Sequence, residues 1–377
     1  MKLTASLLFI TSALIAGTPV KAPIEVKPEP STFDQLWSLA TLYKDKDTFI
    51  NEVSLFGRIH ANWTTVDSDH GDWSDWELRR LRAGLRVKFA DQFDLKTEVR
   101  FLPFEDPIYD GLTEASLTWT PDAAFSLSIG KQLPRYTQEG AISSNELLTI
   151  ERSLLANTFW VGEDNYSTGI SIAGKAGAWQ YYAAALSGES DKAFGKLNAG
   201  WYGVSSLGYD FAKPLKLDRA LLRADYVYND GDPGNTTTKP FSNTYALGWD
   251  VKQDRFGLVG NVITGTGLGK QSDVWGFVLI PTYDLTKKLQ LVARYTFLDS
   301  YGPDGLRPQR RYENEVPDLA GTRGDRYQAL YAGVNYYLYG HKLKLQAGIE
   351  YSHMADSANN GGAFNAWTYS TGIRFSF

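Results

Sequence analysis

The sequence predicts an all-β fold, a transmembrane antiparallel β-barrel of about 16 strands with a short helical segment before it. Three observations favour it. Apolar and polar side chains alternate through most of residues 52–377, short and long connections alternate along the chain, and the last alternating segment ends at Phe377. Successive side chains of a strand point to opposite faces. A barrel in lipid turns the apolar face outward and the polar face to water.

Composition excludes several other classes of protein. The chain has 377 residues, no Cys, four His and a net charge of −5. A disulfide framework, a thiolate metal site and a cysteine nucleophile are therefore excluded, and the negative charge argues against a nucleic-acid partner. No run of about 20 apolar residues follows the first segment, which excludes membrane-spanning helices. We expect no enzyme activity, no cofactor and no metal.

The first 22 residues have the pattern of a signal peptide. Lys2 precedes an apolar stretch over residues 3–16, which is too short for a membrane span. The sequence favours cleavage after Ala22, with a site near residues 16–17 as the other option. A buried N-terminal helix is the alternative interpretation of this segment.

Residues 23–51 are predicted to form a periplasmic linker and a short helix. The linker is rich in proline. Ser31 or Thr32 is placed to cap a helix whose apolar positions run from Phe33 through Tyr43. This segment is expected at the periplasmic mouth or in subunit contacts.

Residues 52–377 are predicted to form the outer-membrane barrel. Short turns are expected near Asp91, Pro121, Ala176, Pro214, Gln253, Thr286 and Gly340. Longer loops are expected near residues 64–75, 102–111, 132–165, 187–198, 229–243, 265–272, 299–325 and 352–363. Fifteen connections of alternating length give sixteen strands, the even number that bacterial barrels require, and place both chain ends on the periplasmic side.

The face of each strand opposite the lipid carries many charged side chains. Strand parity places these basic and histidine residues in the lumen: Arg58, His60, Arg80, Arg82, Arg86, Lys88, Lys96, Arg100, Arg223, Arg294, Lys344 and Arg374. The acidic lumen residues are Asp94, Glu98, Glu114, Asp225 and Glu350. A basic stripe between residues 80 and 100 would attract anions. The alternative is that these charges only pair with one another across strands.

Two motif blocks resemble known proteins. Residues 77–84 read ELRRLRAG, and residues 129–134 read IGKQLP, followed by Ser143-Ser144 and by IERS at 150–153. Together they resemble the phosphate-selective porins of the O and P type, and the resemblance covers about residues 50–377. It implies a sixteen-stranded outer-membrane barrel, usually trimeric, that conducts anions such as phosphate. The motif positions that carry over are Arg80, Arg82, Lys131 and Arg152.

The resemblance also implies that the long loop 132–165 folds inward and narrows the channel. This loop departs from the pattern of phosphate-specific members, since Glu139 and Glu146 stand where tight phosphate binding favours basic residues. A constriction made by this loop is therefore expected to be mixed or acidic unless arginines of the wall dominate. Loop 299–325 is predicted to be a solvated cap, with a substrate-binding lid as the alternative.

The sequence predicts a passive porin of the bacterial outer membrane with a preference for anions such as phosphate. The residues expected to line the pore or bind anions are Arg58, Arg80, Arg82, Arg86, Lys88, Lys96, Arg100, Lys131, Arg135, Arg152 and Arg294. The acidic residues expected in the constriction loop are Glu139, Glu146 and Glu151. The expected partners are small anionic solutes, outer-membrane lipid and lipopolysaccharide, two further copies in a homotrimer, and the barrel-assembly machinery through Phe377.

Other functions stay open on the sequence alone. A general pore, or one that prefers cations or sugars, fits the acidic loop. A non-conducting barrel plugged by residues 31–51 is a second alternative. A rim enzyme would need a group such as His70 with Asp69 and Asp72, a cluster that could also hold a divalent cation weakly.

Overall fold

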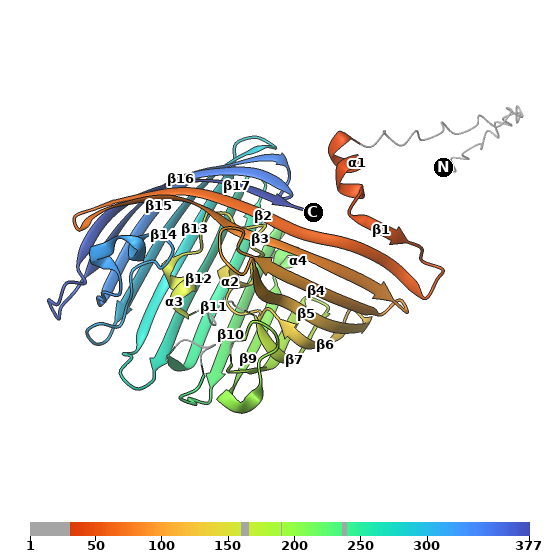
Figure 1. Cartoon of the computed structure of the whole chain (residues 1–377), viewed down its shortest axis with the longest axis horizontal. Coiled ribbons are helices and arrows are strands. Elements are labelled where there is room, and N and C mark those ends of the chain that lie inside the picture. Colours follow the sequence, from red (N-terminus) through yellow and green to blue (C-terminus); the bar gives the residue numbers. More distant parts are fainter. Residues whose placement is uncertain (1–30, 160–165, 190, 236–239) are drawn as a thin grey trace, which may run out of the picture.

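The computed structural model describes residues 31–159, 166–189, 191–235 and 240–377, and in them sixteen strands, β2 to β17, form one closed antiparallel barrel (Figure 1). Each strand pairs with the next, and β17 pairs with β2 to close the ring. The strands are β2 (Ile50–Ser68), β3 (Gly71–Phe89), β4 (Phe93–Phe101), β5 (Tyr109–Asp122), β6 (Phe125–Gln132), β7 (Ser167–Ala176), β8 (Trp179–Ser187), β9 (Trp201–Asp210), β10 (Arg219–Asn229), β11 (Phe241–Gln253), β12 (Phe256–Gly267), β13 (Val274–Asp284), β14 (Leu289–Ser300), β15 (Arg326–Tyr339), β16 (Leu343–Ala355) and β17 (Phe364–Ser376). The predicted fold class is confirmed.

All seven predicted short turns are observed, and one predicted loop is wrong. Residues 64–75 do not form a loop, since β2 and β3 continue through them to a tight turn at residues 69–70. Cross-strand pairs stabilise this extension. Val66 lies opposite Trp73, and the hydroxyls of Thr65 and Ser74 share a hydrogen bond of 2.8 Å.

The short helix α1 (Thr32–Ser38) starts as the sequence predicted and ends earlier. Ser31 and Asp34 form a capping box, which satisfies the first backbone N–H groups. The helix stops at Ser38, where Tyr43 was expected, because β1 (Thr41–Lys44) pairs with the start of β2. Trp37 donates its indole N–H to the carbonyl of Ser376 at 2.6 Å, which fixes α1 against the end of the last strand. The predicted signal peptide lies outside the described residues.

The outer surface of the barrel is apolar. Leu85, Leu95, Leu117 and Ile129 are each about two-fifths exposed or more, on successive strands. Such a continuous apolar band is what lipid contact requires of a barrel. None of the described helices is long and apolar enough to cross a membrane.

The chain end closes the barrel against β2. The Phe377 N–H donates to the Gly57 carbonyl at 3.2 Å, and the Gly57 N–H donates back at 3.1 Å. A Cβ atom at position 57 would lie 2.6 Å from the backbone carbonyl oxygen of Arg82 and 2.8 Å from a carbon of the Phe377 ring, so this position requires glycine. The C-terminal aromatic residue is thus part of the seam between the first and last barrel strands.

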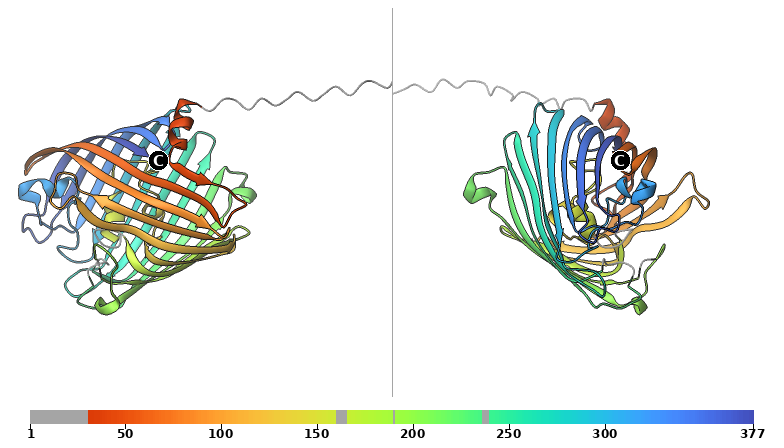
Figure 2. Two further views of the ribbon diagram at one scale, coloured as in Figure 1. Left: turned by 45° about the vertical axis from the view of Figure 1, so that its right-hand side comes forward. Right: turned by 90° about the vertical axis from the view of Figure 1, so that its left-hand side faces the viewer.

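The remaining short helices lie in turns and loops. Two of them, α2 (Gln138–Ala141) and α3 (Leu154–Phe159), belong to the long loop 133–166, whose described residues lie inside the ring of strands (Figure 2). The others are α4 (Ala212–Leu215) and the 3₁₀ turns η1 (Leu197–Ala199), η2 (Glu313–Glu315) and η3 (Pro317–Leu319).

Candidate pore and constriction loop

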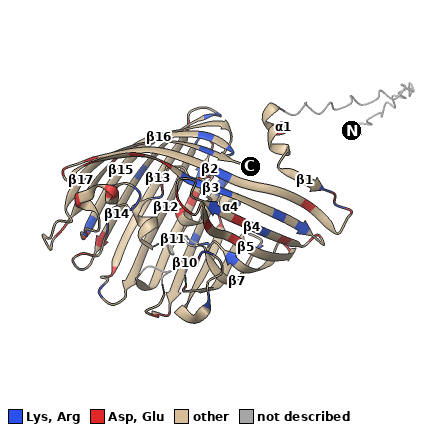
Figure 3. Cartoon of the chain, viewed as in Figure 1, with Lys and Arg blue, Asp and Glu red and all other residues tan. Residues whose placement is uncertain are grey.

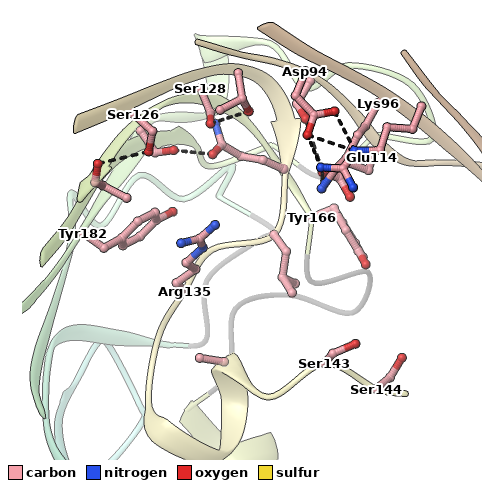
Figure 4. Close-up of a pocket in the computed structure, with 18 of the residues that line it drawn as sticks. Asp94, Lys96, Glu114, Ser126, Ser128, Arg135, Ser143, Ser144, Tyr166 and Tyr182 are labelled. Atoms are coloured by element: carbon pink, nitrogen blue, oxygen red, sulfur yellow. Dashed lines mark hydrogen bonds and ion pairs between the residues drawn. The ribbon is translucent and has the colours of Figure 1, made fainter. Parts of the chain in front are cut away.

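A cavity of about 610 Å³ lies between loop 133–166 and the wall formed by β2–β8, which we call the open half of the barrel (Figure 4). Ten basic side chains line this cavity and three acidic ones, Asp94, Glu114 and Asp122. The basic residues are Arg58, Arg79, Arg80, Arg82, Arg86, Lys96, Arg100, Arg135, Arg152 and Arg311. The cavity surface is therefore rich in cations, although the whole chain has a net charge of −5.

Most of these cations stand on three neighbouring strands. The Lys and Arg positions of the ribbon are blue in Figure 3. The antiparallel register places Arg82 opposite Arg100 and Arg86 opposite Lys96. Like charges in such positions repel one another unless carboxylates or water screen them.

Carboxylates between the strands provide that screening. Glu98, which has no exposed surface, accepts from Arg58 at 2.9 Å and from Arg82 at 3.3 Å. Arg86 pairs with Asp94, and Lys96 lies 3.8 Å from Glu114. The pairing of charges across strands therefore occurs, and it leaves an excess of cations at the cavity.

A β-bulge explains one arginine that strand parity missed. The register between β2 and β3 shifts after His60, which lies opposite Arg80, while Asn62 lies opposite Glu77. The extra residue of a bulge lets two consecutive side chains lean the same way. Arg79 and Arg80 consequently both line the cavity. Arg311, from loop 301–325, was missed because no local pattern tells which loop residue folds inward.

The acidic residues expected in the constriction loop, Glu139, Glu146 and Glu151, are not among the residues that line the cavity. Glu151 binds Arg79 at 2.8 Å. Burial alone would raise the pKa of Glu151, but the guanidinium groups of Arg79 and Arg80 hold it well below its usual value. Glu139 accepts the N–H of Ser153 at 2.8 Å, and Glu146 is exposed outside the cavity lining.

Loop 133–166 packs against the opposite wall, β10–β17, which we call the filled half. Side chains of this wall donate to loop carbonyls: Lys344 to Leu147 at 2.6 Å, Asn335 to Leu148 at 2.9 Å, Arg374 to Ile150 at 3.0 Å and Arg294 to Glu151 at 2.7 Å. The loop backbone has no strand partner, and an unpaired buried carbonyl is costly. These wall residues therefore hold the loop in place.

Apolar contacts complete the packing of the filled half. Leu154, Leu155 and Phe159 of α3 belong to a buried cluster with Ile263 and Val278 of the barrel wall. The inward face of these strands is thus apolar where α3 lies against it. Strand parity predicted a polar lumen, and the inserted helix is the physical reason for the difference.

The predicted pore residues fall into two groups. Eight of the eleven line the cavity, namely Arg58, Arg80, Arg82, Arg86, Lys96, Arg100, Arg135 and Arg152. Three do not. Lys88 pairs with Glu52 at 3.5 Å, Lys131 donates to the Asp191 carbonyl at 2.5 Å, and Arg294 is buried between Thr149 and Glu350. Lys88 and Arg294 face inward by strand parity but are bound by other residues of the chain. Lys131 has the same parity as the lipid-facing Ile129, so the position of its motif did not predict its orientation.

The cluster around His70 is a hairpin turn. Asp69 accepts from the backbone and side-chain N–H groups of Asn365, and His70 contacts the Ala363 carbonyl at 2.8 Å. In the described ranges, no three His, Asp or Glu side chains are grouped to hold a metal ion.

A closed barrel with an apolar outer band, an inserted loop and a charged internal cavity defines the porin class of outer-membrane channels. The family model for phosphate-selective porins O and P matches residues 53–232, slightly less than half of the chain. The resemblance inferred from the motifs is thereby confirmed. No curated protein matches this sequence.

Solved structures of outer-membrane proteins share the fold at low sequence identity. An anion-selective porin from Comamonas acidovorans is 13% identical, with a TM-score of 0.60 over 86% of this chain and 99% of that one. The outer-membrane channel DcaP of Acinetobacter baumannii is 14% identical, with a TM-score of 0.55 over 89% and 99%. The trimer form of OmpT, an outer-membrane protein of Vibrio cholerae, is 13% identical, with a TM-score of 0.54 over 86% and 99%. At these identities the similarity establishes the fold alone.

Proposed function

We propose that this chain is an outer-membrane porin that prefers anions, and that solutes pass along the open half of its barrel. The observation that carries this proposal is the lining of the 610 Å³ cavity, with ten basic and three acidic side chains. A surplus of fixed positive charge in a narrow aqueous passage raises the local concentration of anions and lowers that of cations. Passage is diffusive and needs no bond chemistry.

The position of the loop carboxylates supports the same preference. Glu151 is bound by Arg79, and Glu139 is bound by Ser153, so neither carboxylate faces the passage. Arg152 lies between them in the sequence and lines the cavity. The loop thus turns Arg152 toward the cavity and Glu139 and Glu151 toward the protein, while Glu146 is exposed outside the cavity lining. Phosphate is the anion named by the matching family.

We also propose a homotrimer exported to the outer membrane through a cleaved signal peptide. The trimer form of OmpT supports the oligomeric state. The hydrogen bonds of Phe377 with Gly57 support a role of the C-terminal residue in barrel assembly, since closure of the ring depends on this seam. Lipid and lipopolysaccharide would cover the apolar outer band.

The test is the zero-current potential of purified protein in a planar bilayer with a KCl gradient. Wild-type protein is expected to show an anion-selective potential, and the double variant Arg80→Ala, Arg82→Ala is expected to reduce it. A cation-selective potential would overturn the proposal. Absence of any conductance would instead favour a plugged, non-conducting barrel.

A further inference from the structure

The two walls of the cavity differ in their hydrogen-bonding chemistry. The wall formed by β2–β4 presents arginine and lysine side chains, which donate hydrogen bonds and accept none. The wall formed by β5–β7 presents six neutral hydroxyl groups, those of Ser116, Thr118, Thr120, Ser126, Ser128 and Ser171. Figure 4 shows Ser126 and Ser128 on the side of the cavity away from Lys96. A solute between these walls meets two different surfaces.

Most hydroxyls of this second wall have already used their hydrogen atom. Ser126 donates to the Ala173 carbonyl at 3.0 Å, Ser171 to the Gln132 side-chain oxygen at 2.5 Å, and Ser116 to Glu114 at 3.3 Å. Since a hydroxyl has one donor and two acceptor lone pairs, these groups retain only lone pairs for a solute. Thr118 and Ser128 share one bond of 2.8 Å, which leaves a single hydrogen between them.

This wall is thus predominantly a hydrogen-bond acceptor. Chloride or a fully ionised phosphate brings no hydrogen atoms, so it complements the basic wall and gains nothing from the hydroxyl wall. A solute ammonium group would need carboxylates, but Arg86 and Lys96 engage Asp94 and Glu114. The third carboxylate of the lining, Asp122, accepts the backbone N–H groups of Ala124 and Phe125. Hydroxyl groups of a solute are the donors that match neutral oxygen acceptors.

We propose that the preferred solutes are hydroxylated organic anions, with a carboxylate or phosphate on the basic wall and hydroxyl groups on the β5–β7 wall. This inference rests on the anion preference proposed above and adds the chemical class of the solute. The cavity of about 610 Å³ leaves room for the hydroxylated part of such a solute beside its charged group. A sugar acid and a sugar phosphate both have this chemistry, and the experiment below separates them.

The experiment measures block of the KCl current through single channels by four added anions. Gluconate is compared with butyrate, which is also a monocarboxylate but has no hydroxyl groups. Glucose 6-phosphate is compared at pH 8 with butyl phosphate, a phosphate monoester whose chain has no hydroxyl groups. We expect gluconate, glucose 6-phosphate or both to block at a concentration about fivefold lower than the hydroxyl-free counterpart, the effect of about one hydrogen bond. If only gluconate shows the preference, the anionic group of the solute is a carboxylate. If only glucose 6-phosphate shows it, the anionic group is a phosphate.

The triple variant Thr118→Val, Ser126→Ala, Ser128→Ala removes three lining hydroxyls and keeps every charged residue. It removes Thr118 and Ser128 together, which avoids leaving either hydroxyl without its partner. The variant is expected to lose the fivefold preference while its zero-current potential in KCl stays anion-selective. Thr97→Val, at an exposed position of β4 outside the cavity lining, is the matched control and should retain the preference.

The outcomes separate this inference from the proposed function. Equal block by hydroxylated and hydroxyl-free anions in the wild-type channel, with anion selectivity present, would overturn the solute class and leave the anion porin standing. An unchanged preference in the triple variant would also overturn it. A cation-selective wild-type channel would overturn both proposals. The wild-type comparison decides the question even where the triple variant fails to fold.

Discussion

Inward-facing arginine and lysine side chains have different roles in the open half and the filled half of this barrel. Arg82 and Arg86 in the open half pair with carboxylates of neighbouring strands and line a cavity. Arg294 and Lys344 in the filled half are almost fully buried and bind backbone carbonyls of the inserted loop. Cations of both halves contact the inserted loop, but only those of the open half, such as Arg58 and Arg79, also line the cavity.

This difference in burial predicts a difference in the cost of substitution. A partly hydrated pair is worth little to stability, whereas removing one member of a buried pair leaves an uncompensated charge. The filled half should therefore control the position of the loop and, together with the buried Glu98 that Arg58 and Arg82 bind in the open half, the stability of the barrel. The open half should control which ions pass.

The largest effect is expected for Arg294→Ala in the filled half. The substitution removes donors to Thr149, to the Glu151 carbonyl and to Glu350, and leaves the Glu350 carboxylate with one fewer cation in a buried site. We expect a loss of about 3–5 kcal/mol in the free energy of unfolding, together with a higher single-channel conductance as the loop is released. Urea unfolding and bilayer recordings measure the two effects. Arg326→Ala, which breaks an exposed pair with Asp299, is the control and should change neither.

The second prediction concerns pH and the external loop 301–325, which packs on the filled half. Glu313 of this loop accepts from Tyr327 at 2.8 Å and from the Gln309 backbone at 2.7 Å, and Glu350, Tyr312 and Ser352 lie close to it. Burial raises its pKa to about 7, above the ordinary value of 4.5. Because the folded-state pKa is the higher one, loop docking is most stable at low pH and weakens as the pH rises from about 4.5 to about 7.

Limited proteolysis of loop 301–325 measures this dependence. We expect cleavage to be at least about tenfold faster at pH 8 than at pH 5, since one unit of pKa shift corresponds to a factor of ten. The variant Glu313→Gln should abolish the pH dependence of the cleavage rate. The control variant Glu315→Gln, at an exposed neighbouring position, should leave this pH dependence unchanged. Equal cleavage rates of the wild-type loop at both pH values would contradict the control of loop docking by Glu313.

A smaller effect is expected for Lys344→Met. The variant loses the donor from Lys344 to the Leu147 carbonyl, but Gln346 still reaches that carbonyl at 3.2 Å. The interaction free energy between the loop and the wall should fall by about 1 kcal/mol. The barrel should still fold, and the rate of current fluctuations should rise about fivefold. Current noise equal to that of wild type would show that the loop does not depend on this contact.

The smallest effects are expected in the open half, where they should have opposite signs. Arg86→Ala removes a cavity cation, while Asp94→Asn removes the carboxylate paired with it. The ratio of anion to cation permeability should fall about twofold in the first variant and rise by a similar factor in the second. Both changes should shrink in 1 M salt, where the screening length falls to about 3 Å. A change of the same sign in both variants would contradict an electrostatic mechanism.

The barrel could be predicted from the sequence because its signals are local. Period-two alternation and seven short turns give the strand number without knowledge of any contact. The extended hairpin at residues 64–75 was missed because polar strand ends above the membrane, such as Thr65 and Ser74, resemble a loop.

The pore could be predicted only in part, because parity tells which side chains face inward and not what lies inside. Arg294 and Lys344 have the same sequence signature as Arg82, yet loop 133–166 covers the first two. The bulge that turns Arg79 inward depends on the register between β2 and β3. The loop glutamates looked like pore charges because their partners, Arg79 and Ser153, are identified only by the folded loop.

The division of the barrel into an open and a filled half can be tested directly because the chain has no Cys. Single cysteines at Lys96 in the open half and at Gln346 in the filled half would be treated with a negatively charged thiol reagent during bilayer recording. We expect rapid loss of current for Lys96→Cys, which lines the cavity, and no reaction for Gln346→Cys, whose side chain is 3% exposed. Equal reaction at both positions, or reaction at position 346 alone, would contradict the account.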